Sequence, residues 1–393
     1  MTDLQSSDPP AASMRRRDAL LGLFAFQLRR SSAALGLFFS TVTGNRASAN
    51  VIGATPCEPL AVAEASWAQQ RRARVAHALQ AGFGVQYWGK SFTAKDLAAA
   101  PHGFFIIETA KIGANANEKS REVFFTPDEV RQIGHNSKRP VLGYLNLGKI
   151  EHYRDYWVDA NGQANLRDTI INSAAPWVGP TIGQDGTLAR FWTPEWAAIL
   201  SDRVDRLMRQ GIDGLFLDDV LQYYAYYSAL DQGRPGFSTA GGPVSATDFA
   251  RAMMALVVQI ANRARQHDCQ ALIVVNSGIY IGRDAGPDQP HSQLPASFAQ
   301  YRLAIDGVLI ESVFASGGDD PAILVLHEEF ASQGIPILTV DFADTAKEPF
   351  AEFRTKTALR AISEGFAPYI ADDAAFDRLY APIPINKADL AVP

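Results

Sequence analysis

The stretch Gly211–Asp219 reads GIDGLFLDD, and about ninety residues later the segment Ala304–Ser312 reads AIDGVLIES. Both copies place Ile-Asp-Gly before three apolar residues and an acid. Asp-Gly suits a turn that leaves a helix, because Asp can hydrogen-bond nearby backbone and Gly relieves the turn. The apolar residues that follow suit a buried strand. Each copy therefore predicts a helix, a turn and a strand that ends on a carboxylate.

Similar apolar runs recur along most of the chain. Runs that are apolar at successive positions, instead of alternating with polar residues, suit strands buried on both faces, as in parallel sheets. The predicted strands are residues 85–88, 104–107, 141–145, 215–217, 272–275, 308–310, 335–340 and 367–370. Eight such strands are the number that a parallel barrel requires.

Helical patterns separate these strands. Leu200, Val204 and Leu207 fall on one helix face, and Gly211 follows where a left-handed residue would end the helix. The segment 245–260 repeats the arrangement behind an approximate capping box. We therefore expect an α/β fold, a (β/α)8 TIM barrel. An open doubly wound sheet is the alternative, and the absence of a GxGxxG or phosphate loop weakens its nucleotide-binding form.

Composition and charge restrict the class of protein. A chain of 393 residues with 47% hydrophobic side chains can bury a large core. The net charge of −6 and the scattered Lys and Arg residues leave no basic patch for nucleic acid. We divide the chain into a leader (1–49), a lead-in segment (50–80) that packs as a helix on the N-terminal side of the barrel, and the barrel itself (81–393).

The leader differs in kind from the rest. Ser13–Gly22 places an arginine cluster before an apolar run, and Ala47–Ala49 offers the small residues that a signal peptidase needs. We expect an export signal, with the twin-arginine type as one option, and hence a periplasmic or extracellular protein. Arg29 and Arg30 interrupt the apolar stretch, which is too short for a spanning helix of about 20 residues, so stable membrane insertion is not expected. A disordered extension without a targeting role is the alternative.

Two further features stay open. Cys57 and Cys269 are the only cysteines, and they could form one disulfide or remain two free thiols. The segment 113–127 is predicted to be a loop inserted over the active face. No cofactor or metal is expected, because no group of residues shows metal-ligand spacing. A metal-dependent deacetylase on the same fold is disfavoured for the same reason.

Asp218 ends the fourth predicted strand and Glu311 ends the sixth. Barrel enzymes assemble their active sites at the carboxyl ends of several strands. Glycoside cleavage needs two carboxyl groups, about 5–5.5 Å apart for retention of configuration or about 6.5–9.5 Å for inversion. We expect Asp218 to be the nucleophile and Glu311 the acid/base. The opposite assignment, the use of Asp219 after a one-residue strand shift, and purely structural helix caps are the alternatives.

Other polar and aromatic residues follow the predicted strands or lie in the loops beyond them. Aromatic faces commonly pack against sugar rings, although aromatic side chains also fill ordinary cores. The expected substrate-binding residues are Trp88, Glu108, Tyr144, Asn146, Trp192, Asp219, Tyr223, Asn276 and Asp341. The segment Tyr223–Tyr227, which reads YYAYY, is placed in a loop close to Asp218.

Five motifs in order resemble glycoside hydrolase family 114, the endo-α-1,4-polygalactosaminidases and their bacterial relatives. The motifs are Val141–Gly148 with Tyr153-Arg154, Phe191–Trp196, Gly211–Asp218, Val274–Asn276 and Asp306–Phe314. The resemblance covers about residues 80–372. It implies a TIM-barrel hydrolase that cleaves α-linked, galactosamine-containing polysaccharide, with an Asp after strand four and a Glu after strand six. Those positions match Asp218 and Glu311.

The chain departs from this family pattern at two places. Lys149 stands where many bacterial relatives carry Glu, although Glu151 is close enough in sequence to replace it. Leu221 stands where relatives often carry Asp, and the chain adds Asp219 instead. These departures affect the expected substrate more than the expected fold. A partly deacetylated galactosamine polymer is cationic and would be attracted by an acidic cleft. The alternative function is a non-catalytic glycan-binding barrel of an exopolysaccharide system, which would not need both acids.

Overall fold

The computed structural model describes residues 61–110, 123–151, 153–157, 170, 175–182, 186–239, 241–287, 297–315 and 319–385. The predicted leader and most of the segment 113–127 lie outside these residues. Cys269 is disulfide-bonded, and Cys57, the other cysteine of the sequence, lies outside the described residues. Across the described part of the chain, no helix is both long and apolar enough to cross a membrane.

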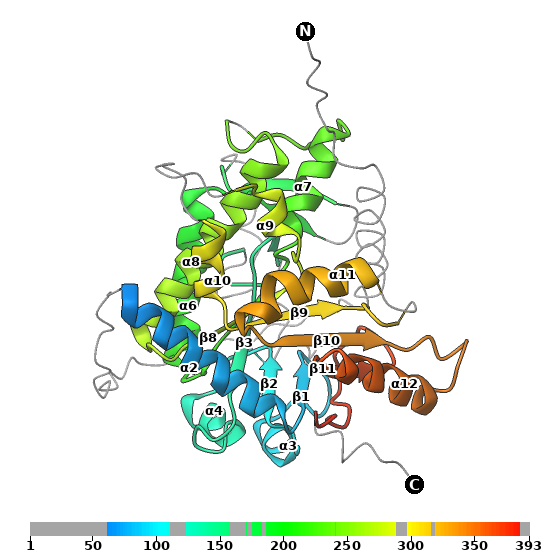
Figure 1. Ribbon diagram of the computed structural model, residues 1–393. Helices are drawn as coiled ribbons and strands as arrows, with labels where there is room; N and C mark the ends of the chain where they lie inside the picture. Colours follow the sequence, from blue (N-terminus) through cyan, green and yellow to red (C-terminus); the bar gives the residue numbers. More distant parts are fainter. Residues whose placement is uncertain are drawn as a thin grey trace.

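Eight parallel strands form a nearly closed, TIM-barrel-like sheet (Figure 1). In sheet order they are β1 (Phe83–Gln86), β2 (Phe104–Ile107), β3 (Val141–Asn146), β7 (Gly214–Asp218), β8 (Leu272–Asn276), β9 (Gly307–Glu311), β10 (Ile337–Phe342) and β11 (Ala367–Ala371). At the seam between the end strands, the Tyr369 hydroxyl donates to the Val85 carbonyl oxygen at 3.2 Å. The predicted α/β barrel is confirmed, and the first strand lies two residues earlier than predicted.

Helices surround the strands. They are α2 (Ala61–Leu79), α3 (Ala94–Ala99), α4 (Pro127–Ile133), α6 (Pro194–Arg209), α7 (Gln222–Asp231), α8 (Ala246–His267), α9 (Ile281–Asp284), α10 (Phe298–Ala304), α11 (Asp320–Val325) and α12 (Phe350–Ser363). Helix α6 ends before Gly211, whose φ of 83° is left-handed as predicted. Helix α8 starts with the predicted capping box, in which Ser245 and Asp248 bond each other's backbone.

The segment Tyr223–Tyr227 lies in helix α7, so its prediction as a loop is wrong. Tyr223, Tyr224 and Tyr226 are buried, which gives α7 an aromatic face to pack against neighbouring helices. Burial of large aromatic side chains at helical spacing stabilises the helix through tertiary packing, despite the modest helix propensity of tyrosine.

A second, smaller sheet follows β3 and was not predicted. It consists of β4 (Lys149–Ile150), β6 (Thr187–Ala189) and β5 (Val178–Thr181), paired antiparallel in the order β4-β6-β5. Its strands have two to four residues, which is too short for a periodic sequence signal. The sheet places Lys149 directly beyond the carboxyl end of β3.

The first Asp of the repeated motif ties its turn to the neighbouring strand. An oxygen of Asp213 accepts a hydrogen bond at 3.0 Å from the backbone N–H of Val141, the first residue of β3. The other oxygen pairs with Arg74 of α2. Helix α2 is blue in Figure 1, and its arginines bind the turns that precede the strands. This end of the barrel is therefore the amino-terminal end of the strands.

The second Asp repeats the arrangement in a more buried form. Asp306 is 0% exposed, and its side chain accepts a hydrogen bond at 2.9 Å from the backbone N–H of Ile273 in β8. It forms ion pairs with Arg71 of α2 at 2.9 Å and with Arg265 of α8 at 3.0 Å. The repeated Ile-Asp-Gly thus fixes two helix-to-strand turns and the position of α2.

Alternate residues of each strand point into the barrel or toward the helices, as the pleat requires. The inner set packs into one cluster that includes Val85, Phe104, Ile106, Leu142, Phe216, Val274, Leu309, Leu338 and Val340. The same alternation continues to the strand ends. It directs Asp218, Asn276 and Glu311 inward, and it directs Asp341 toward the outer layer.

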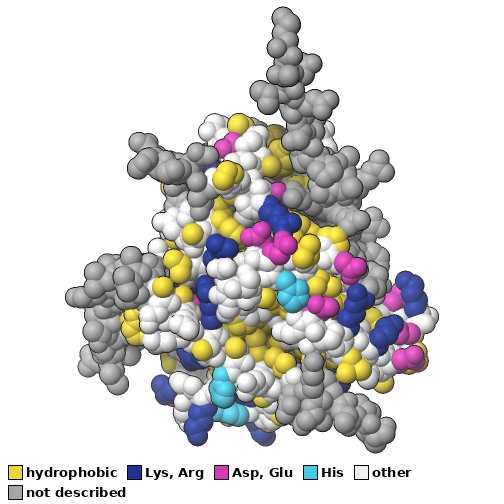
Figure 2. All heavy atoms as spheres, viewed as in Figure 1, with side chains coloured by type: hydrophobic (Ala, Val, Ile, Leu, Met, Phe, Trp, Pro, Cys, Tyr) yellow, Lys and Arg dark blue, Asp and Glu magenta, His cyan; other side chains and the backbone are white. Residues whose placement is uncertain are grey.

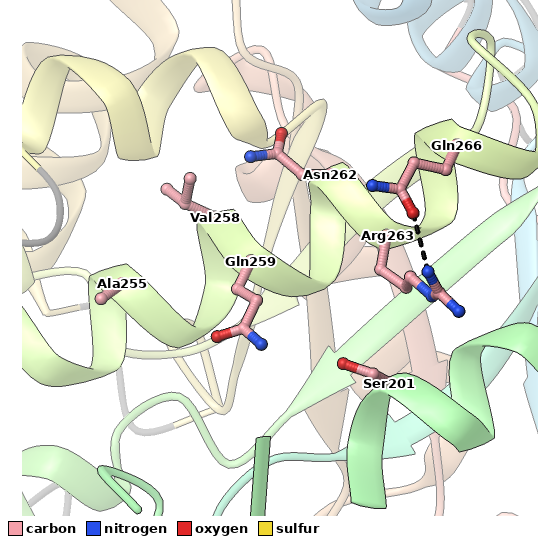
Figure 3. Close-up of a pocket in the computed structure, with 7 residues that line it drawn as sticks. All are labelled: Ser201, Ala255, Val258, Gln259, Asn262, Arg263 and Gln266. Atoms are coloured by element: carbon pink, nitrogen blue, oxygen red, sulfur yellow. Dashed lines mark hydrogen bonds between the residues drawn. The ribbon is translucent and has the colours of Figure 1, made fainter. Parts of the chain in front are cut away.

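The outer surface carries charges of both signs. Figure 2 shows both basic and acidic side chains on the face seen in Figure 1, with the acidic ones mainly in the centre and on the right of the view. An open groove of about 500 Å³ lies on α6 and α8 (Figure 3). It is lined by Ser201, Ala255, Val258, Gln259, Asn262, Arg263 and Gln266, none of which belongs to the carboxyl ends of the strands.

Candidate active site

Polar side chains from adjacent strands converge at the carboxyl end of the barrel. Asn146 of β3 is in register with Asp218 of β7. The next two strands in the sheet, β8 and β9, end on Asn276 and Glu311. Because these four residues share the inward parity of their strands, their side chains meet above the packed interior. The sequence-predicted pair Asp218 and Glu311 therefore lies in one cluster.

Asp218 accepts hydrogen bonds through both carboxylate oxygens. One oxygen accepts from the Tyr144 hydroxyl at 2.7 Å. The other accepts from the Asn276 side-chain amide at 2.8 Å and from the backbone N–H of Asp219 at 2.7 Å. Burial, together with the nearby charges of Asp219 and Glu311, raises the pKa of Asp218 to about 7, although the hydrogen bonds from Tyr144 and Asn276 oppose the shift.

Asn276 joins the two candidate catalytic carboxyl groups. Its amide nitrogen lies 2.8 Å from an oxygen of Asp218 and 2.8 Å from an oxygen of Glu311. A side-chain amide has two N–H groups, so it can donate to both oxygens at once. These two oxygens consequently lie no farther apart than twice 2.8 Å.

The backbone turns sharply just after each of these three strands. Asp219, Ser277 and Ser312 directly follow β7, β8 and β9, and their φ angles are 60°, 61° and 59°. Residues other than glycine rarely adopt this left-handed conformation, which costs on the order of 1–3 kcal/mol each. Such strain persists where surrounding contacts over-determine it and is concentrated at functional sites. Here it occurs three times beside the carboxyl cluster.

Asp219 is held in a separate network beside Asp218. It is 2% exposed, and its carboxylate accepts from the Asn146 amide at 2.8 Å and lies 3.5 Å from the Lys149 ammonium. The Asn146 side-chain oxygen in turn accepts from the backbone N–H of Lys149 at 2.7 Å. Burial lowers the pKa of Lys149, but the charges of Asp219 and Asp218 outweigh burial and raise it. Lys149 is therefore a cation within the site.

Glu108 lies at the end of β2 in a buried ion-pair network. Its two oxygens lie 2.7 and 3.1 Å from the guanidinium of Arg154, which is 1% exposed. Arg154 also donates to Glu151 at 2.8 Å, and the Tyr153 hydroxyl donates to Glu151 at 2.5 Å. Arg154 thus balances part of the charge of both glutamates. It holds Glu108 in place, as an ion pair with good geometry does in a buried site.

Asp341 does not join the cluster. It is 0% exposed, and one of its oxygens accepts from the backbone N–H groups of Phe314 and Ala315, both at 2.8 Å. Burial raises its pKa to about 6. Its outward parity in β10 explains this position, which differs from the predicted substrate-binding role. Asp341 instead holds the loop that follows Glu311.

Two predicted aromatic contacts pack among helices. The Trp192 ring lies 4.8 Å from the ring of Tyr226 and 5.3 Å from that of Phe249, measured between centroids. Tyr223 is 1% exposed, and its hydroxyl donates to Asp284 of α9 at 2.8 Å. These contacts assign both residues to the helical layer at the loop side of the barrel, and none of them involves Asp218 or Glu311.

Trp88 lies at the rim of the barrel mouth. It is 43% exposed, and its indole N–H donates to the carbonyl oxygen of Ala375 at 2.7 Å. Trp88 lies two residues past the end of β1, so its side chain points to the opposite face from that of Tyr87. The exposed ring is available for contact with a ligand that extends over the rim.

Tyr87 was missed by the sequence analysis. Its ring lies 4.8 Å from the ring of Tyr144 and 5.0 Å from that of Phe376. Burial and the charges of Asp218, Glu311 and Glu108 raise its pKa well above the ordinary value. Tyr87 thus lies among the carboxylates, and it packs against the inner cluster that contains Phe83 and Val85.

Within the described ranges, no three His, Cys, Asp or Glu side chains are grouped so as to hold a metal ion. The chemistry available at the cluster is that of paired carboxyl groups. They are positioned by neutral amide and hydroxyl donors, with a lysine ammonium to one side.

Comparison with known proteins gives a family match. The sequence model described as Glycoside-hydrolase family GH114 matches residues 108–381, more than half of the chain, and this range includes Asp218 and Glu311. The chain is 24% identical over 242 residues to an uncharacterized protein of Deinococcus radiodurans and 26% identical over 253 residues to one of Thermotoga maritima. These alignments cover 60% and 62% of this chain. They cover 64% and 66% of those proteins, a little under two thirds of their length.

Structural comparison also finds two solved proteins, each with a TM-score of 0.48. The glycoside hydrolase domain of PelA from Pseudomonas aeruginosa is 18% identical with a TM-score of 0.48, and the match covers 77% of this chain and 98% of that one. Ega3 from Aspergillus fumigatus, solved in complex with galactosamine, is 12% identical with a TM-score of 0.48. That match covers 76% of this chain and 93% of that one.

Proposed function

This chain belongs to glycoside-hydrolase family GH114, and on that premise we propose that it hydrolyses α-linked, galactosamine-containing polysaccharide. Asp218 and Glu311 are the two catalytic carboxyl groups in this proposal. The substrate class rests on the family resemblance, and the two residues rest on their positions at the ends of β7 and β9.

A single observation supports the catalytic pair most strongly. One amide nitrogen, that of Asn276, lies 2.8 Å from both carboxyl groups. The resulting limit on the separation of the two nearest oxygens is compatible with the roughly 5–5.5 Å between the carboxyl groups of retaining glycosidases. The proposal is therefore a retaining mechanism through a covalent intermediate.

Asp218 is the nucleophile in this mechanism. Three donors hold its carboxylate at fixed orientation, and each of them stabilises the ionised form. One Asp218 oxygen forms a bond to the anomeric carbon as the glycosidic C–O bond breaks. A carboxylate fixed in advance requires little reorganisation for this step.

Glu311 is the acid/base. It donates its proton to the departing glycosidic oxygen, then removes a proton from the water that releases the sugar from Asp218. The charge of Glu311 is one of the causes that raise the pKa of Asp218 to about 7, so the two groups are electrostatically coupled. When Glu311 carries its proton, its charge no longer opposes ionisation of Asp218, and both groups have the protonation state that the first step needs.

The polymer would extend along the mouth of the barrel. Tyr87 and Tyr144 contribute aromatic surface beside the pair, and Trp88 contributes an exposed ring at the rim. Cleavage within the polymer instead of at its end is part of the proposal, as is action outside the cytoplasm, where such polysaccharides occur. Both follow from the family resemblance and the predicted leader.

The experiment uses the protein without residues 1–49 and an α-1,4-linked, partly deacetylated galactosamine polymer. New reducing ends are measured for the wild type, Asp218→Asn and Glu311→Gln. Each variant should bind the polymer but release oligosaccharides on the order of 10³-fold more slowly or worse, because each removes a group that acts as a unit with the other.

Matched controls are available on the outer helices. Asp202→Asn on α6 and Glu352→Gln on α12 make the same chemical changes at exposed positions, and they should leave the rate unchanged. If the wild type binds the polymer without cutting it, the chain is a glycan-binding barrel. If either Asp218→Asn or Glu311→Gln retains the full rate, that residue is not catalytic.

A further inference from the structure

Lys149 lies beside the carboxyl cluster, where the proposed sugar would bind. Its ammonium lies 3.5 Å from an oxygen of Asp219, and its side chain is 22% exposed. The small sheet fixes its backbone, because Lys149 of β4 pairs with Leu188 of β6. The Asn146 side-chain oxygen also accepts from the Lys149 backbone N–H at 2.7 Å. The cation is therefore held near the site by main-chain contacts.

A short chain of contacts connects this cation to Asp218. Asp219 accepts from Asn146 at 2.8 Å, and the same Asn146 amide lies 3.0 Å from the Tyr144 hydroxyl. That hydroxyl donates to Asp218 at 2.7 Å. Lys149 consequently lies on the β3 and β7 side of the mouth, next to the proposed nucleophile, and Glu311 approaches from the β9 side.

The charges of the other acids are partly balanced as well. Glu108 and Glu151 share the guanidinium of Arg154, and Asp219 pairs with Lys149. On the side of the nucleophile, an ammonium group on a bound sugar would therefore meet the Lys149 ammonium. Without this cation, the acidic groups of the cleft would attract the ammonium group.

The amino-bearing carbon of a hexosamine is bonded to the anomeric carbon, so its substituent lies close to the nucleophile whichever way the ring is turned. We propose that Lys149 makes this subsite select an N-acetylated hexosamine over one with a free ammonium group. The neutral acetamido carbonyl can accept a hydrogen bond from a lysine ammonium, whereas an ammonium substituent is repelled by it. This inference rests on the proposed function and names the sugar bound over Asp218.

Selectivity between two ligands tests the inference without requiring turnover. In a Glu311→Gln background, the dissociation constants of α-1,4-linked N-acetylgalactosamine oligosaccharides and of their fully deacetylated counterparts are measured by calorimetry. The expected preference for the acetylated form is about tenfold or more. Lys149→Arg keeps the charge and should keep this preference, while Lys149→Gln should reduce it and Lys149→Glu should reverse it.

Two measurements separate a local effect from folding and from net charge. Thermal unfolding shows whether each variant is folded at the binding temperature. Lys95→Glu changes the net charge equally at an exposed position on α3 and should leave the ratio of the two dissociation constants unchanged.

The outcomes are distinct. If the wild type prefers the deacetylated oligosaccharide, or if the ratio is the same in all Lys149 variants, the inference is overturned while the proposed hydrolase function stands. If neither oligosaccharide binds any of the folded proteins, both the inference and the proposed substrate class are overturned.

Discussion

The side-chain amide of Asn276 donates to Asp218 at 2.8 Å, and the same nitrogen lies 2.8 Å from Glu311. The last residue of β8 therefore sets the distance between the last residues of the strands on either side of it. This brings one oxygen of each carboxyl group within twice 2.8 Å of the other, which is the geometry on which the proposed retaining mechanism rests. The protonation of the two groups is interdependent, because the charge of Glu311 is one of the causes that raise the pKa of Asp218.

Removal of this donor should change both the rate and its pH dependence. A hydrogen bond to a carboxylate lowers its pKa, so Asn276→Ala should raise the pKa of Asp218 further above 7. The ascending limb of kcat/KM should move to higher pH, and kcat should fall on the order of 10²-fold. A pH–rate profile measures both effects. Asn262→Ala, in the groove of Figure 3, is the matched control, and an unshifted profile for Asn276→Ala would show that the amide does not control the pair.

The raised pKa of Asp218 predicts that the site destabilises the fold at neutral pH. Because the folded pKa is about 7 and the ordinary value is 3.8, the folded protein binds more protons than the unfolded chain between these values. Stability should therefore fall as the pH rises from about 4 to 7. Asp218→Asn removes the charge, so it should raise the free energy of unfolding by about 1–3 kcal/mol at pH 8.

The control for this effect is to compare the stability change caused by Asp218→Asn at two pH values. At pH 4 the wild-type carboxyl is largely protonated in the folded state, so Asp218→Asn should change stability little there. Urea unfolding at pH 4 and pH 8 measures both free energies. An equal change at the two pH values would mean that the substitution acts through packing and not through charge.

The amino-terminal end of the barrel should contribute stability without contributing to catalysis. Asp306 is 0% exposed and binds two arginines and a backbone N–H. Arg71→Ala removes one partner and leaves a buried charge less compensated, so the free energy of unfolding should fall by about 3–5 kcal/mol. Arg74→Ala, whose pair with Asp213 is more exposed, should cost less.

Activity measurements complete this comparison. Both arginine variants should keep the wild-type kcat at temperatures where they are folded, because the residues lie at the opposite end of the strands from Asp218. A large loss of kcat in folded Arg71→Ala would indicate that α2 influences the active face.

Much of this fold could be predicted from hydrophobic runs, because strands buried on both faces leave a simple signal. The repeated motif also indicated the positions of Asp218 and Glu311. In each copy the strand lies between a turn and an acidic residue, so its carboxyl end is closely defined. Asn276 followed from the same reasoning. The sequence did not show which residues of each strand point into the barrel, because a continuous apolar run gives no sign of the direction of each side chain.

Several differences between the expected and the observed positions of side chains follow from that missing information. The first strand was placed two residues too late, so Trp88 was chosen at its end and the inward-facing Tyr87 was missed. Asp341 follows an apolar run just as Asp218 does, but its strand presents it to the outer layer. Tyr223 lies in a helix whose aromatic face is stabilised by burial, and burial cannot be deduced from a tyrosine cluster alone. The ion pairs of Lys149 and Arg154 depend on tertiary contacts that no local pattern predicts.

The most direct test of the central claim is azide rescue of Asp218→Ala and Glu311→Ala on an activated α-galactosaminide, with the configuration of the glycosyl azide determined by NMR. If Asp218 is the nucleophile, azide attacks from its vacated side and Asp218→Ala yields the β-azide. Glu311→Ala, in which Asp218 still forms the covalent intermediate, yields the α-azide. The reverse pattern would exchange the two roles, and absence of rescue in both folded variants would contradict a retaining mechanism carried by this pair.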